Sequence, residues 1–98
     1  MKHAGEKALD ELEDLICDIR KLGGLRERRR GAFYKKAIGF LHFHEDPAGL
    51  FADLKVGDRF ERFPVGTHAE REQLLARVRA CLTDDSSIRV EKPENADR

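Results

Sequence analysis

Apolar residues recur every three or four positions in the first part of the chain, which is the spacing of one face of a helix. The stripe consists of Leu9, Leu12, Leu15, Ile16, Ile19 and Leu22. Acidic residues and Lys21 lie between them, and Gly23-Gly24 follows. Because glycine readily takes the left-handed conformation in which many helices end, the pattern predicts a helix over residues 6–22.

The period then changes to short runs rich in aromatic and β-branched residues, separated by turn residues. The runs are GAFYKK (31–36), IGFLHFHE (38–45), GLFADLKV (49–56) and RFERFPV (59–65). DPAG (46–49) has the residues of a tight turn, and Gly57-Asp58 those of a two-residue hairpin. Since loops this short join antiparallel neighbours, the runs predict a four-stranded meander.

A second helix is expected after Thr67, because Thr67 and Glu70 have the spacing of a capping box. Its apolar stripe consists of Leu74, Leu75, Val78, Cys81 and Leu82. The expected fold class is α+β: a four-stranded antiparallel meander with an N-terminal and a C-terminal helix packed on one face. Residues 1–98 form a single domain, with an ordered core over about 6–83, a flexible tail over 84–98 and a short extended piece at 88–90.

Side chains alternate across a strand, so the turn at residues 46–49 sets which residues share a face. Placing Glu45 opposite Leu50 puts His42 opposite Asp53 and His44 opposite Phe51, and the next hairpin puts Arg62 opposite Asp53. A slip by one residue would move Asp53 into the helix-covered core. The face away from the helices is then predicted to carry Phe33, Phe40, His42, His44, Phe51, Asp53, Lys55 and Arg62, with Tyr34 on the helix side.

Composition narrows the class of protein. The 19 basic and 19 acidic residues cancel, which argues against a dedicated nucleic-acid binder. No run approaches the ~18 apolar residues of a membrane span, and residues 1–20 lack the apolar stretch of a signal peptide. Cys17 and Cys81 occupy apolar positions of the two helices and are interpreted as buried hydrophobes. We therefore expect a cytoplasmic protein with neither a membrane partner nor a cofactor.

The predicted outer face is half aromatic and half ionisable, whereas a face that only meets water would carry Thr, Lys and Glu. The leading hypothesis is a binding or interaction module that uses this face, as a homodimer, with another protein or with a small-molecule ligand.

Two alternatives remain open. One is a small-molecule or metal-dependent enzyme centred on His42, His44 and Asp53, with His42 and Asp53 as the best catalytic candidates because a carboxylate orients and activates an imidazole. No metal site is assigned, since zinc needs three or four converging ligands and the direct neighbour of His44 is Phe51. The other alternative is a weak nucleic-acid binder that uses the basic segment 26–36.

The pKa of His42 can move in either direction. The Asp53 carboxylate favours the charged imidazolium, and burial disfavours it. Because Asp53 is the direct cross-strand neighbour, we expect the carboxylate to prevail and to raise the pKa above ~6.5.

The order of the elements and several short motifs resemble known bacterial domains. The order of an initial helix, the LGGL turn (22–25), FYKK (33–36), a strand ending in HFHED (42–46), GLFADLKV (49–56), FERFPV (60–65) and a final helix is similar to that of small uncharacterised bacterial domains. It resembles the MmcQ/YjbR-like proteins, which also run from an initial helix through a meander with a K-x-F … G-L segment. HFHEDPAGLFADL (42–54) is similar to the H-x-H … L-A-D segment of the small domain associated with luciferase-like proteins. The resemblance implies an α+β fold over roughly residues 8–82; for the first group it also implies DNA binding. Phe60 to Phe63 stand where both groups tend to carry a tryptophan.

Overall fold

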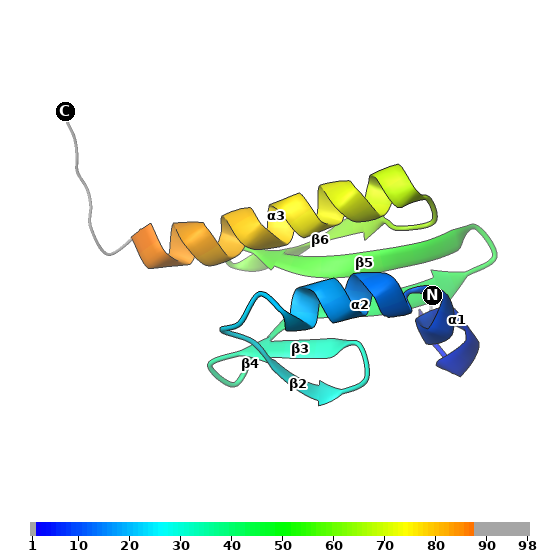
Figure 1. The fold of residues 1–98 in the computed structure, drawn as a ribbon, viewed down its shortest axis with the longest axis horizontal. Helices are drawn as coiled ribbons and strands as arrows, with labels where there is room; N and C mark the ends of the chain where they lie inside the picture. Colours follow the sequence, from blue (N-terminus) through cyan, green and yellow to red (C-terminus); the bar gives the residue numbers. More distant parts are fainter. Residues whose placement is uncertain (1, 88–98) are drawn as a thin grey trace.

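Five antiparallel strands follow one another in the computed structural model, which describes residues 2–87, and each strand pairs with the next (Figure 1). They are β2 (Arg26–Arg29), β3 (Ala32–Lys35), β4 (Ile38–Asp46), β5 (Gly49–Val56) and β6 (Arg59–Pro64). A two-residue strand, β1 (Lys2–His3), pairs with β4 beyond the end of β3. The meander therefore has five strands, where the sequence predicted four.

The additional strand is β2, which lies in the basic segment 26–36, before the first of the four predicted strand runs. Alternation along β2 puts Glu27 opposite Phe33, on the helix side of the sheet. There Arg20 donates to both carboxylate oxygens of Glu27, at 2.6 and 3.0 Å, and the Gly31 N–H donates to one of them at 2.9 Å. The inward-facing residue of β2 is therefore the charged Glu27 and not an apolar residue. The alternation of apolar and polar residues that predicts a strand is missing for this reason.

Helices lie at both ends of the described chain, as predicted. They are α1 (Glu6–Glu11), α2 (Glu13–Arg20) and α3 (His68–Ser87). The first predicted helix is interrupted at Leu12, whose backbone (φ −94°, ψ 6°) leaves the helical region, and α1 departs from the direction of α2 there (Figure 1). Figure 1 shows α2 and α3 side by side over one face of the sheet.

The hydrophobic core lies between these helices and the sheet. Leu12 between α1 and α2, Ile16 and Ile19 of α2, and Leu74 and Val78 of α3 are fully buried. They meet the inward-facing residues of the central strands, which are Leu41, Phe43, Ala52 and Leu54. The two cysteines differ from expectation, because each is half-buried.

The capping box at the start of α3 is confirmed. The Glu70 N–H donates to Thr67 Oγ1 at 3.2 Å, and the Thr67 N–H donates to Glu70 Oε1 at 3.1 Å. The helix continues to Ser87, past the predicted limit at residue 83; the extended piece expected at residues 88–90 lies outside the described residues. None of the described helices combines the length and apolar character needed to cross a membrane.

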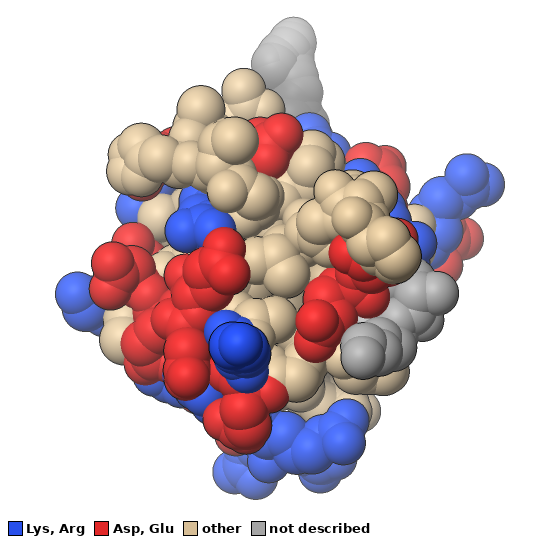
Figure 2. Space-filling view, turned by 90° about the vertical axis from the view of Figure 1, so that its right-hand side faces the viewer, with Lys and Arg blue, Asp and Glu red and all other residues tan. Residues whose placement is uncertain are grey.

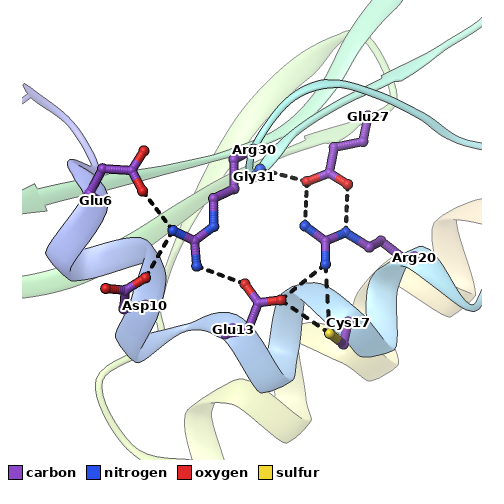
Figure 3. A network of polar contacts seen from close by, with 8 residues as sticks. All are labelled: Glu6, Asp10, Glu13, Cys17, Arg20, Glu27, Arg30 and Gly31. Carbon is purple, nitrogen blue, oxygen red and sulfur yellow. Dashed lines mark hydrogen bonds and ion pairs between the residues drawn. The ribbon is translucent and has the colours of Figure 1, made fainter.

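An ionic network ties the first helices to β2 and the turn that follows it (Figure 3). Arg30 contacts Glu6, Asp10 and Glu13 at 2.8, 2.9 and 2.8 Å. Glu13 also accepts from Arg20 at 3.1 Å, and these arginines hold the pKa of Glu13 down to about 2. Arg20 and Arg30 are therefore neutralised on the helix side of the molecule.

Candidate metal centre on the open face of the sheet

The predicted register of the central hairpins is found. His42 lies opposite Asp53, His44 opposite Phe51, and Arg62 opposite Asp53. The loops of the two hairpins, Pro47-Ala48 after β4 and Gly57-Asp58 after β5, are each two residues long and fix this pairing. His42, His44, Asp53 and Arg62 consequently project from three adjacent strands onto the face that α2 and α3 do not cover.

Two phenylalanines that were expected on this outer face are in the core. Phe33 lies opposite Leu41, on the helix side, and is 2% exposed; Phe40 is 5% exposed and belongs to the core cluster. The pairing passes from Phe33–Leu41 to Tyr34–Gly39, so Phe40 is the extra residue of a β-bulge. A bulge changes the direction of the side chains that follow it, which the strict alternation used for the prediction does not allow. Tyr34, which was expected on the helix side, lies on the outer face.

The remaining polar residues form one connected cluster. Arg62 Nε and Nη2 donate to Asp53 Oδ1 and Oδ2, at 2.8 and 2.9 Å. His44 Nε2 lies 3.0 Å from Asp53 Oδ2, and His42 Nδ1 lies 3.1 Å from the same His44 nitrogen. His44 and Asp53 are 8% and 9% exposed, because their neighbours cover them.

A residue absent from the predicted site, His3, joins the cluster from β1. It pairs with His44 across the strands, and its ring centroid lies 4.9 Å from that of His44 and 5.8 Å from that of His42. The Ala4 N–H donates to the Phe43 carbonyl at 3.1 Å, and the Gly5 N–H donates to Glu45 at 2.6 Å. A two-residue strand has no periodicity to detect, so the only sequence signal for His3 is its residue type.

The expected aromatic and basic neighbours are distributed around the cluster. Phe51 is half-buried on the outer face, opposite His44. Lys55 lies opposite Phe60, with its ammonium 5.6 Å from the ring centroid. Phe60 is 45% exposed, and its ring centroid lies 5.3 Å from that of His42. Phe60 was not among the predicted site residues, although alternation from Arg62 places it on the same face.

The donor and acceptor roles of the ring nitrogens in the cluster depend on the tautomers. In the tautomer of a neutral His44 that carries its proton on Nε2, this N–H donates to the Asp53 carboxylate and faces the lone pair of His42 Nδ1. The other His44 nitrogen, Nδ1, is buried and has no hydrogen-bond partner within residues 2–87.

The pKa of His42 is lowered, which corrects the expectation of a raised value. Burial is the largest cause, and the neighbouring His44 is the next; Asp53 acts in the opposite direction but does not prevail. Asp53 interacts more closely with Arg62 and His44, and Arg62 is the main reason that the Asp53 pKa is lowered. The cluster therefore combines an ionised carboxylate with a His42 imidazole that favours its neutral form.

These are the protonation states of metal ligands. His42, His44 and Asp53 each offer a donor atom, and the three atoms lie within 4.8 Å of one another. Tetrahedral ligands at ~2.1 Å from a zinc ion would be roughly 3.4 Å apart. The two contacts at 3.0 and 3.1 Å thus need to open by a few tenths of an ångström, and the third pair of donor atoms, which lies within 4.8 Å, needs to close.

No family model, curated protein or solved structure matches the chain. The resemblance to the MmcQ/YjbR-like proteins and to the luciferase-associated domain therefore stays a prediction.

Proposed function

We propose that this protein is a binding module that holds a divalent transition-metal ion on the open face of its sheet, through His42, His44 and Asp53. The observation that supports it best is the convergence of His42 Nδ1 and Asp53 Oδ2 on His44 Nε2, at 3.1 and 3.0 Å. When a neutral His44 carries its proton on Nε2, that single proton lies between the three groups. A metal ion that takes the place of this proton would be coordinated by His44 Nε2, His42 Nδ1 and Asp53 Oδ2. His44 stays neutral in this state, because its one proton is then on Nδ1.

The donor set selects the class of ion. Two imidazoles and one carboxylate suit Zn²⁺ and its first-row neighbours, and are unsuited to the all-oxygen shells of Ca²⁺ and Mg²⁺. Arg62 has the role of an outer partner that keeps Asp53 ionised and oriented. The Arg62 charge and the buried Nδ1 of His44 both oppose the ion, so we expect micromolar rather than picomolar affinity.

Metal titration of the untagged, metal-stripped protein tests this proposal. We expect one Zn²⁺ or Co²⁺ per chain, a rise in the unfolding temperature, and d–d absorption of Co²⁺ typical of a nitrogen–oxygen site. An ion at 100 times its dissociation constant stabilises the fold by about 2.7 kcal/mol.

Matched substitutions locate the site. His42→Gln and Asp53→Asn should each weaken binding more than ~10-fold, since each removes a direct ligand. His68→Gln is the control, because the His68 side chain is 89% exposed at the start of α3. Absence of stoichiometric binding, or an equal loss in the His68 variant, contradicts the proposal.

The enzyme alternative becomes testable once an ion is bound. A bound ion with a free coordination position supplies Lewis-acid chemistry and an activated water. His42 would then be a ligand and not the general base that its pairing with Asp53 suggested.

We also propose that the outer face contacts a second protein, most simply another copy of this chain in the cytoplasm. Exposed Phe60 and half-buried Phe51 support this, whereas Phe33 and Phe40 no longer do. Light scattering after size exclusion should give twice the mass of one chain, and Phe60→Ser should shift the mass toward the monomer.

A further inference from the structure

The zero net charge of the chain conceals two oppositely charged regions. Residues 6–20 contain six acidic and two basic residues, whereas residues 26–36 contain six basic residues and one acidic residue. Viewed from one end, the molecule shows acidic side chains gathered on one side and basic side chains along another edge (Figure 2). Because exposed charges act over a screening length of ~8–10 Å, a ligand responds to the local distribution of charge more than to the net charge of the chain.

The sheet divides the arginines of residues 26–30 between its two faces. Arg30 is surrounded by acids on the helix side (Figure 3). Arg26 lies opposite Tyr34 and Arg29 opposite Ala32, positions that alternate with Phe33 and therefore face outward. No ion pair is found for Arg26, Arg28 or Arg29 within the described residues, and all three are exposed.

A hollow of about 320 Å³ lies beside Arg26 and Arg28. Its polar wall consists of Arg26, Arg28, Tyr34 and Lys36, and no acidic residue lines it. The Arg28 guanidinium carbon lies 4.9 Å from the centroid of the Tyr34 ring, a cation–π contact that holds the arginine at the wall. We call this feature the basic hollow.

The turn that carries Lys36 to the basic hollow has an unfavourable backbone. Lys36 and Ala37 have φ of 51° and 70°, and they are the non-glycine residues with positive φ in the described chain. Two such residues between paired strands form a turn that strongly prefers Asn-Gly. The stability of the turn therefore does not explain why residue 36 is a lysine.

We propose that the basic hollow binds a small molecule that carries a chain of phosphate groups. Three cations converge there without a compensating acid, and arginine matches phosphate oxygens with paired hydrogen bonds. A volume of about 320 Å³ equals that of roughly ten waters at ~30 Å³ each, enough for a di- or triphosphate group. The proposal is independent of the metal centre, because the two sites share no residue.

Calorimetric titration with inorganic tripolyphosphate tests the inference, on protein freed of metal and of chelator by dialysis. We expect one site per chain, amide shifts in ¹⁵N spectra confined to residues 24–37, and affinity that falls steeply as sodium chloride is raised. The Arg26→Ala/Arg28→Ala variant should bind at least ~10-fold more weakly, since each charge-assisted contact accounts for about that factor. Lys36→Asn/Ala37→Gly, which keeps the turn and removes the charge, should also weaken binding.

The control is Arg79→Ala, which removes an exposed arginine of α3 and should leave the affinity unchanged. Equal weakening in this variant, shifts outside residues 24–37, or no binding at low salt overturns the inference. Much tighter binding of a ten-residue oligothymidylate than of tripolyphosphate also overturns it, in favour of a nucleic-acid strand. Failure of the metal titration does not affect any of these outcomes.

Discussion

Gly31 is the position where a single methyl group should disturb the fold most. Its φ is +78°, and a Cβ built there would lie 2.9 Å from Leu9 Cδ2, 3.4 Å from Phe43 Cδ2 and 3.7 Å from Ile16 Cδ1. Leu9, Phe43 and Ile16 are all buried core residues. The Gly31→Ala change therefore combines a strained backbone with overpacking between α1, α2 and the sheet.

The two costs can be separated. A side chain at positive φ costs about 1–2 kcal/mol, and an extra methyl in a packed core costs about 1–3 kcal/mol. Gly23 has nearly the same φ, +77°, and nothing within 4 Å of its Cβ position. We expect a loss of about 1–2 kcal/mol for Gly23→Ala and about 2–5 kcal/mol for Gly31→Ala, so the difference measures the clash.

Urea unfolding of both variants gives these free energies directly. A double variant then tests the cause: in a Leu9→Ala background the extra cost of Gly31→Ala should disappear, because the closest atom is gone. Equal losses for Gly23→Ala and Gly31→Ala, or a penalty that persists without Leu9, would refute the close packing of α1 against this turn.

Two further predictions concern the β3–β4 turn and the histidine cluster. Lys36→Asn/Ala37→Gly should raise the free energy of unfolding by about 1–2 kcal/mol, since both positions have positive φ; unchanged urea midpoints would argue against that backbone. His42 has a folded pKa below its unfolded value of ~6.5, so the unfolded chain binds more protons and stability should fall as pH drops below ~6.5 in metal-free protein. NMR titration of the His42 ring carbons checks this, and Asp53→Asn should lower that pKa further, because the carboxylate is what opposes the burial. A wild-type value above ~6.5 would show that burial does not dominate.

The sequence correctly predicted the features that depend on residues close together in the chain, namely the helix cap and the hairpin registers. The Thr67–Glu70 capping box specifies two hydrogen bonds by spacing alone, and both are present. The turn at residues 46–49 specifies the register that sets His42 opposite Asp53, and the hairpin at Gly57-Asp58 specifies the register that sets Arg62 opposite Asp53. In each case the relevant partners lie within one turn or one hairpin.

The errors arose where the partners are distant or the pattern is irregular. The bulge at Phe40 depends on how β3 and β4 fit together, and it exchanged the faces expected for Phe33 and Tyr34. The pairing of β1 with β4 brings His3 to His44. This pairing depends on contacts between segments that are distant in the sequence, so the local residue preferences of either segment do not predict it. Burial of His42 likewise follows from neighbours on three strands, so the direction of its pKa shift could not be read from Asp53 alone.

The outermost strands of the sheet have a consequence for how copies of the chain meet. A free sheet edge presents unpaired backbone N–H and C=O groups and invites another strand to join it. At one edge, β2 has the sequence RERR, so a second β2 laid alongside would set arginines against arginines. At the other edge, β6 has Arg59, Glu61 and Arg62 exposed and ends at Pro64, which has no N–H to donate. Both borders therefore oppose growth of the sheet into larger aggregates by the addition of strands at its edges.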